Sequence, residues 1–145
     1  MRTRCLTLWR LSVLYAALTV VLAYPLSMRP SNAVMSHGPD TDLFVWMLAW
    51  DTHAFTHYPL SIFDANIYYP QRHTLAYSEN VIGSAILAAP VIWITGNPLL
   101  AMNLVALASS VLCALGAWLL ARRVGLSAAG AVVCSVVFGF SPPRR

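Results

Sequence analysis

The sequence predicts an all-α integral membrane protein with about four transmembrane helices and a large first external loop that carries short interfacial helices. Of its 145 residues, 59% are hydrophobic and 10% are charged, whereas soluble domains carry roughly 25% charged residues. All five acidic residues and all four histidines lie between positions 37 and 79, with long apolar runs on both sides. Because a buried charge is costly in hydrocarbon, the apolar runs are the candidate spans and the polar window lies outside the bilayer.

The first predicted span covers residues 11–28. Arg2, Arg4 and Arg10 precede it, and an arginine-rich start places the N-terminus in the cytoplasm. The same pattern also suits a secretory signal, for which residues 31–33 (Ser-Asn-Ala) would be the cleavage site. The length of the run and the further spans behind it favour a retained helix over a cleaved signal.

Residues 29–80 form the predicted external loop, which faces the outside of the cell if the N-terminus is cytoplasmic. The loop begins with a stretch rich in helix breakers that ends at Pro39, and a mostly apolar segment follows at 41–55. The rest of the loop has the composition of turns and extended chain, at Tyr58-Pro59, Asp64-Ala65-Asn66 and Tyr68-Tyr69-Pro70.

Two further spans are predicted at 81–96 and 98–121, joined by a tight turn around Gly96. Pro98 suits the first position of the second helix, because the N–H that proline lacks has no helical partner there. That helix also carries small residues at a spacing of four, a pattern that lets membrane helices approach closely: Ala106, Ser110 and Ala114.

A fourth, shorter span is predicted at 125–141, after Arg122 and Arg123. Alternation from a cytoplasmic N-terminus places this arginine pair outside, whereas the excess of positive charge in cytoplasmic loops would place it inside. A re-entrant segment at 81–96 would remove the conflict; we keep alternation because three arginines precede the first span. Since four helices offer few partners for buried polar groups, we expect residues 1–145 to be a single membrane module from the N-terminal part of a larger protein.

The composition argues against several classes of function. The net charge of +4 comes from nine arginines and no lysine, and these arginines lie singly or in pairs at segment ends rather than in a patch for nucleic acid. Cys5, Cys113 and Cys134 have no metal-type spacing. Two of them lie within apolar runs, so we expect them to pack as small side chains rather than to form a disulfide or a zinc site.

The densest polar cluster is Gly38-Pro39-Asp40-Thr41-Asp42. Two carboxylates this close repel each other at a low-dielectric boundary, so one should hold a proton or a cation should lie between them. The first outcome gives a general base, and the second gives a divalent cation that binds phosphate. No other cofactor is indicated. The alternative is structural, with Asp40 or Asp42 as the cap of a helix that begins here.

Further polar residues lie on an expected helix over 42–57. At about 100° per residue, His53 shares a face with Asp42, and Asp51 lies on the opposite face. Asp42 and His53 would nonetheless be roughly 16 Å apart along the axis, too far to act on one atom. His53 and His57 have a spacing that chelates metals, but a third ligand would have to fold back. We therefore predict no metal site at this histidine pair and assign Asp51 and His53 to substrate binding.

Arg72, Tyr77 and Glu79 are the other substrate-binding candidates. Arg72 is one of two cations in the loop, and arginine is suited to bidentate binding of phosphate. Tyr77 offers a ring on which a sugar can stack, and Glu79 lies at the mouth of the next span. The alternative is that Arg72 pairs with Asp64 or Glu79 and that the tyrosines anchor the loop at the membrane interface.

Five short motifs follow the N-terminal helix in a definite order. They are GPDTD at 38–42, WMLAWD at 46–51, IFDANIYYP at 62–70, TLAYSE at 74–79 and GNP at 96–98. This order resembles the start of bacterial multi-pass membrane glycosyltransferases of the C-type fold, akin to the protein-mannosyltransferase-like and lipid-A-sugar-transferase-like families. The resemblance covers essentially the whole chain.

The resemblance implies a transferase in the bacterial cytoplasmic (inner) membrane that takes a sugar from a polyprenyl-phosphate carrier and passes it to an acceptor at the outer face. An acidic residue in the first external loop is the usual catalytic base of that class, a role that falls on Asp40 or Asp42 here. The implied partners are a lipid-linked sugar donor and membrane lipids; the acceptor is not indicated. Such enzymes have many more helices, so we expect this chain alone to lack activity.

Two other hypotheses remain open. One is a non-enzymatic membrane subunit or transporter fragment whose external loop only stabilises an assembly. The other is a truncated gene product without a function of its own. A catalytic loop requires its carboxylates, whereas a loop that only stabilises an assembly tolerates asparagine in their place.

Overall fold

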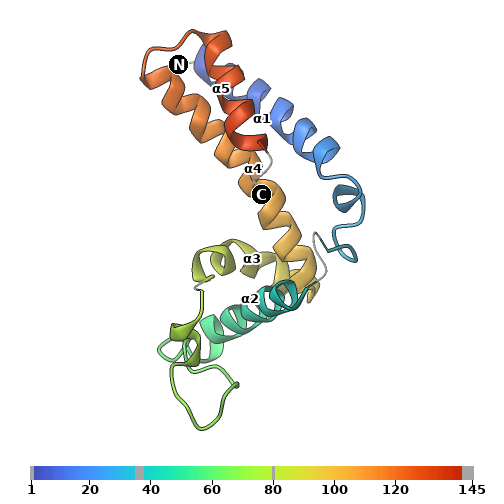
Figure 1. The fold of residues 1–145 in the computed structure, drawn as a ribbon, viewed down its shortest axis with the longest axis vertical. Coiled ribbons are helices and arrows are strands. Elements are labelled where there is room, and N and C mark those ends of the chain that lie inside the picture. Colours follow the sequence, from blue (N-terminus) through green and yellow to red (C-terminus); the bar gives the residue numbers. More distant parts are fainter. Residues whose placement is uncertain (1, 35–37, 80, 142–145) are drawn as a thin grey trace. The chain divides into compact units, whose positions relative to one another are not determined.

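The structure, a computed structural model, describes residues 2–34, 38–79 and 81–141. Every regular element in these ranges is a helix (Figure 1), so the predicted all-α class is confirmed. Five are α-helices and two are short 3-10 helices: α1 (Arg2–Leu22), η1 (Leu26–Met28), α2 (Pro39–His57), η2 (Thr74–Tyr77), α3 (Ile82–Thr95), α4 (Pro98–Arg123) and α5 (Ala128–Phe140).

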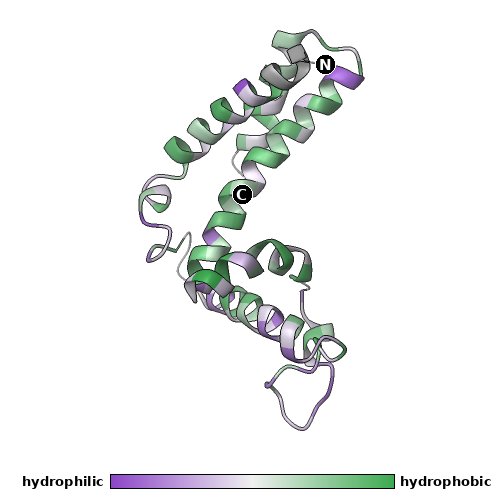
Figure 2. Cartoon of the chain, turned by 180° about the vertical axis from the view of Figure 1, so that it is seen from behind, coloured by the Kyte–Doolittle hydropathy of each residue, from purple (hydrophilic) through white to green (hydrophobic). Residues whose placement is uncertain are grey.

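The helices differ in whether they could cross a bilayer. Among the described residues only α4, with 26 residues, is both long and apolar enough to do so. The 14 residues of α3 and the 13 of α5 rise only about 21 and 20 Å, less than the roughly 30 Å of a hydrocarbon core. Figure 2 shows hydrophobic residues along α3, α4 and α5, and most hydrophilic ones in α2 and the loop after it. Helix length therefore supports one candidate span, and the other three predicted spans stay predictions.

The chain divides into two compact units, Met1–Met28 with Ala106–Arg145 (the terminal unit) and Arg29–Val105 (the central unit). The core of the terminal unit forms around Tyr15 of α1, which is fully buried. Its hydroxyl shares a hydrogen bond of 2.5 Å with the hydroxyl of Ser135 in α5. A hydroxyl pair of this kind satisfies two polar groups that no water reaches.

Helices α4 and α5 approach closely in the terminal unit. A Cβ placed on Gly139 would lie 2.8 Å from the Cβ of Ala114 and 3.2 Å from its Cα. Ala114 is fully buried, and it belongs to the row of small residues that predicted a close helix contact. The prediction is confirmed at this residue.

The central unit contains α2 and α3, which pack against each other, and the start of α4. Leu48 of α2, Ala85 and Ala88 of α3, and Ala101 of α4 form its buried core. Asn103 of α4 is 1% exposed, and its side-chain amide donates to two backbone carbonyls of the preceding segment, at 2.7 and 2.8 Å. These carbonyls belong to Pro30 and Ala33.

Local sequence signals set the helix boundaries in this unit. Helix α3 ends at Gly96, whose φ of +66° is one that glycine adopts without strain. Asn97 then accepts a hydrogen bond from the backbone N–H of Leu100 through its side-chain oxygen at 2.9 Å. The predicted turn at Gly96 and the helix start at Pro98 are both confirmed.

Candidate active site

One stripe of helix α2 combines carboxylates with apolar side chains. Asp40, Phe44, Met47 and Asp51 are spaced by four, three and four residues, and this spacing keeps side chains on one helical face. The stripe spans about 16 Å of helix. It faces two neighbouring hollows, and the same residue, Glu79, contributes to both.

The larger hollow is a cleft of about 320 Å³ at the start of α2. Asp40 and Glu79 supply its two carboxylates, and Ser78 adds a hydroxyl. Its apolar lining comes from Leu43, Phe44 and Met47. A volume of this size accommodates a small ligand, and half of the lining residues are polar.

The smaller hollow is a cavity of about 10 Å³ further along α2, the space of about one water molecule. Asp51 lines this cavity together with Glu79 and Met47. Asp51 is only 3% exposed. Removal from water disfavours the charged form, so burial raises the pKa of Asp51 to about 6.

The structure separates the two catalytic candidates. Gly38 is the N-cap of α2 and Pro39 lies in its first turn, so the alternative in which Asp40 or Asp42 caps the helix is wrong. Both carboxylates lie in the first turn, where negative charge favours the helix dipole. Asp40 lines the cleft, whereas Asp42 is exposed and does not.

The histidine pair forms part of an exposed aromatic row. The rings of His53 and His57 are stacked with centroids 4.1 Å apart, and Tyr58 and Trp50 extend the row. No group of three metal-ligating side chains exists among the described residues. His53 is exposed, as Asp42 is, and neither residue lines the cleft.

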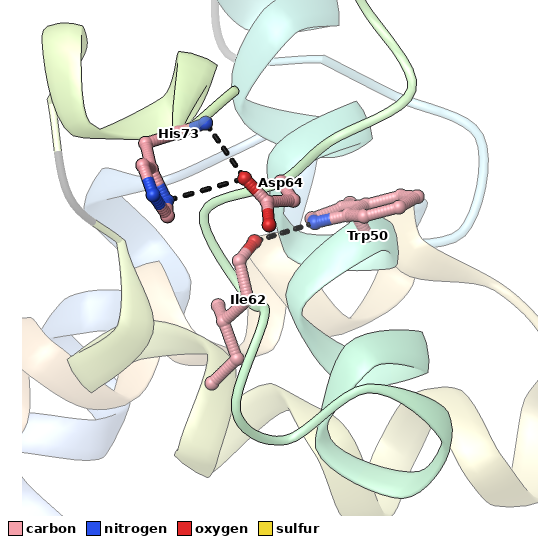
Figure 3. Close-up of polar contacts among 4 residues, drawn as sticks. All are labelled: Trp50, Ile62, Asp64 and His73. Atoms are coloured by element: carbon pink, nitrogen blue, oxygen red, sulfur yellow. Dashed lines mark hydrogen bonds and ion pairs between the residues drawn. The ribbon is translucent and has the colours of Figure 1, made fainter.

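The loop after α2 is held by its own polar contacts (Figure 3). The indole N–H of Trp50 donates to the carbonyl of Ile62 at 2.8 Å. Asp64 Oδ1 accepts the backbone N–H of His73 at 2.7 Å and lies 3.1 Å from its Nδ1. The predicted alternative of an Arg72–Asp64 pair is therefore wrong, because Asp64 takes His73 as its partner.

Arg72 and Tyr77 do not reach the cleft in this structure. Both are exposed, with 87% of Tyr77 accessible, and neither lines the hollow that contains Asp40. Of the five substrate-binding candidates, the structure brings Glu79 to Asp40 in one cleft, and Asp51 to Glu79 in the adjoining cavity. His37, a candidate third metal ligand beside His53 and His57, lies outside the described residues.

The stripe from Asp40 to Asp51 and the contribution of Ser78 were not predicted from the sequence. A signal for the stripe exists, because a separation of eleven residues is close to three helical turns and returns to the same face. The approach of Ser78 and Glu79 has no local signal, since it depends on the path of the intervening loop.

Comparisons with models of protein families, with curated proteins and with solved structures find no match to this chain.

Proposed function

We propose that this chain is the catalytic-loop part of a membrane glycosyltransferase, which transfers a sugar from a polyprenyl-phosphate-linked donor to an acceptor hydroxyl at the outer face of the cytoplasmic membrane. The cleft lined by Asp40 and Glu79 is the observation that carries this proposal. It brings together an exposed carboxylate in the first turn of a helix, a second carboxylate, a hydroxyl and three apolar side chains.

The proposed reaction assigns one proton transfer to Asp40. Its carboxylate removes the proton of the acceptor hydroxyl, and the acceptor oxygen forms a bond to the anomeric carbon through an oxocarbenium-like state. The bond between that carbon and the phosphate oxygen breaks, and the lipid phosphate leaves with the bonding electrons. A single displacement of this kind inverts the anomeric configuration.

Two other residues have supporting roles in this proposal. Glu79 shares the cleft with Asp40 and is suited to accept hydrogen bonds from sugar hydroxyls. Arg72 is exposed and makes no ion pair with any other described residue, so its guanidinium is available to a phosphate leaving group. It would reach the cleft only when the donor is bound.

The membrane setting is part of the proposal. Only 11% of the most apolar stretch of α4 is buried, whereas the core helix of a soluble protein is mostly buried. We place α1, α3 and α5 in the same bilayer as the other predicted spans. The loop over residues 29–80 lies at the external surface in this arrangement.

The test is transfer activity of the natural gene product in membranes supplied with a panel of polyprenyl-phosphate-linked hexoses and pentoses. Asp40→Asn should lower the rate by about 10²–10⁴-fold, the range lost when a general base is removed. Asp42→Asn is the matched control: it makes the same change two residues away, outside the cleft. Activity that survives in Asp40→Asn would refute the catalytic assignment and favour the non-enzymatic subunit.

A further inference from the structure

An apolar groove of about 400 Å³ lies between α4 and α5 in the terminal unit. Figure 1 shows α5 running beside the second half of α4. Cys113, Gly116 and Leu120 form one wall of the groove, and Cys134 and Phe138 form the other. Its surface is almost wholly apolar, so an occupant has to bring hydrocarbon.

Two arginines lie at one end of this groove. Arg122 donates from Nη1 to the carbonyl oxygen of Leu126 at 2.5 Å, and Leu126 itself lines the groove. The guanidinium of Arg122 is therefore held at the rim. Arg123 is its neighbour and is exposed, and among the described residues none forms an ion pair with its guanidinium.

The terminal unit has no acidic side chain that could neutralise these arginines. All five Asp and Glu residues of the chain lie between positions 40 and 79, which belong to the central unit. The arginines lie in the last turn of α4, where the helix dipole offers the equivalent of about half a negative charge. Half a charge does not balance two guanidinium groups, so this end of the groove attracts an anionic group from outside the unit.

We propose that this groove binds an anionic glycerophospholipid, with one acyl chain between α4 and α5 and the phosphate on Arg122 and Arg123. Basic sites between membrane helices are suited to anionic headgroups, and arginine matches phosphate geometry. A second protein helix would fill the groove without supplying an anion. The proposal rests on the membrane setting proposed above, but not on glycosyl transfer.

Gly116 provides a direct way to block the groove. A Cβ on this glycine meets no atom within 4 Å, and the glycine lies on the groove wall. Gly116→Phe should therefore occupy the groove without displacing protein atoms. Leu119→Phe is the matched control, because Leu119 lies on the same helix, is 48% exposed and does not line the groove.

The experiment is photo-crosslinking of the full chain in nanodiscs with a phosphatidylglycerol that carries a diazirine in its acyl chain. A phosphatidylcholine with the same chain and a diazirine-labelled polyprenyl phosphate are the comparison probes. Phosphatidylglycerol should label peptides within 113–138 about 30-fold more than phosphatidylcholine. Phosphatidylglycerol carries a net negative charge whereas phosphatidylcholine is zwitterionic, and each arginine near an anionic headgroup is worth about 1 kcal/mol, or about fivefold. It should also label them more than polyprenyl phosphate does.

The variants complete the test. Gly116→Phe should abolish the labelling, and Arg122→Gln with Arg123→Gln should reduce it to the level of phosphatidylcholine. Leu119→Phe and Arg10→Gln should leave it unchanged. Equal labelling by both phospholipids, or stronger labelling by polyprenyl phosphate, overturns the proposal. Carbonate extraction shows whether the wild type and each variant are inserted in the membrane, so a loss of labelling can be told apart from a loss of insertion. A wild-type chain that is extracted would refute the membrane setting and this proposal together.

Discussion

Asp51 is the residue whose state depends most on its surroundings. Its carboxyl group is 3% exposed, and its pKa is raised from 3.8 to about 6 by burial. Between about pH 4 and pH 6 the carboxyl group of Asp51 is protonated in the folded protein and ionised in the unfolded chain. Folding stability contributed by this group is therefore highest in acid and falls as the pH rises toward 6.

Asp51→Asn removes this titration. The raised pKa of Asp51 corresponds to a fall in the free energy of unfolding of at most about 3 kcal/mol between roughly pH 4 and pH 6. The free energy of unfolding of Asp51→Asn should not show this fall. Thermal unfolding in detergent at pH 4.5 and 7.5 measures it, because the melting temperature of the wild type should fall more between these values than that of the variant. The exposed Asp42→Asn should keep the wild-type difference. Equal pH dependence in Asp51→Asn and wild type would contradict the buried, raised carboxyl.

At the scale of elements, the close contact between α4 and α5 depends on one glycine. Gly139 faces the Cβ and backbone of Ala114 at distances that leave no room for a methyl group. Overpacking of a close helix contact forces backbone shifts. The small residue is therefore needed for its size rather than for its conformational freedom.

Gly139→Ala should destabilise the terminal unit by about 1–2 kcal/mol, the cost of overpacking less the gain in helix propensity. Gly116→Ala is the matched control on α4, where the new methyl group meets open space, and it should stabilise by about 0.5–1 kcal/mol. Unfolding in a denaturant series measures both variants. A stabilising Gly139→Ala would show that the two helices are further apart than described.

Helix positions were predictable because they follow from local signals. The predicted spans at 81–96 and 98–121 correspond closely to α3 and α4, since a glycine turn and a proline start mark the boundary. The apolar segment at 41–55 lies within α2. The partner of Asp64 was not predictable, because it depends on His73 adopting a left-handed backbone with φ of 56°, which is rare for a residue other than glycine.

The site was predicted in composition but not in arrangement. Asp40 and Glu79 were both candidates, yet only the folded loop places them in one cleft. The predicted helical faces were defined relative to Asp42, which is exposed. The face that Asp40 shares with Asp51 was therefore not recognised. Side-chain pairing between distant segments is fixed by tertiary packing, and a local pattern does not contain it.

For the whole molecule, the partition of charge is the dominant property. All acidic side chains belong to the central unit, and every charged side chain of the terminal unit is an arginine. Charged residues are excluded from hydrocarbon, so the concentration of acidic side chains within residues 29–80 supports the proposed aqueous setting of this loop.

A cysteine introduced at residue 61 tests whether the loop over residues 29–80 is external. In a chain whose three native cysteines are replaced by serine, Ser61→Cys should react with a membrane-impermeant maleimide in right-side-out vesicles and not in inverted ones. Ser61 is exposed, so access is decided by the side of the membrane alone. The native Cys5, kept as the single cysteine, should show the opposite pattern. Labelling of position 61 only in inverted vesicles would place the loop in the cytoplasm, away from an outward-facing donor.

The hydrogen bond between Tyr15 and Ser135 joins residues separated by 120 positions in the chain. At about 5–20 residues per second, the ribosome needs roughly 6–24 s to make the second hydroxyl after the first. In the proposed bilayer setting, the first helix must wait through that interval with its phenol unpaired. A nascent chain of this protein therefore depends on the insertion machinery, or on headgroup contacts, to shelter Tyr15 until α5 arrives.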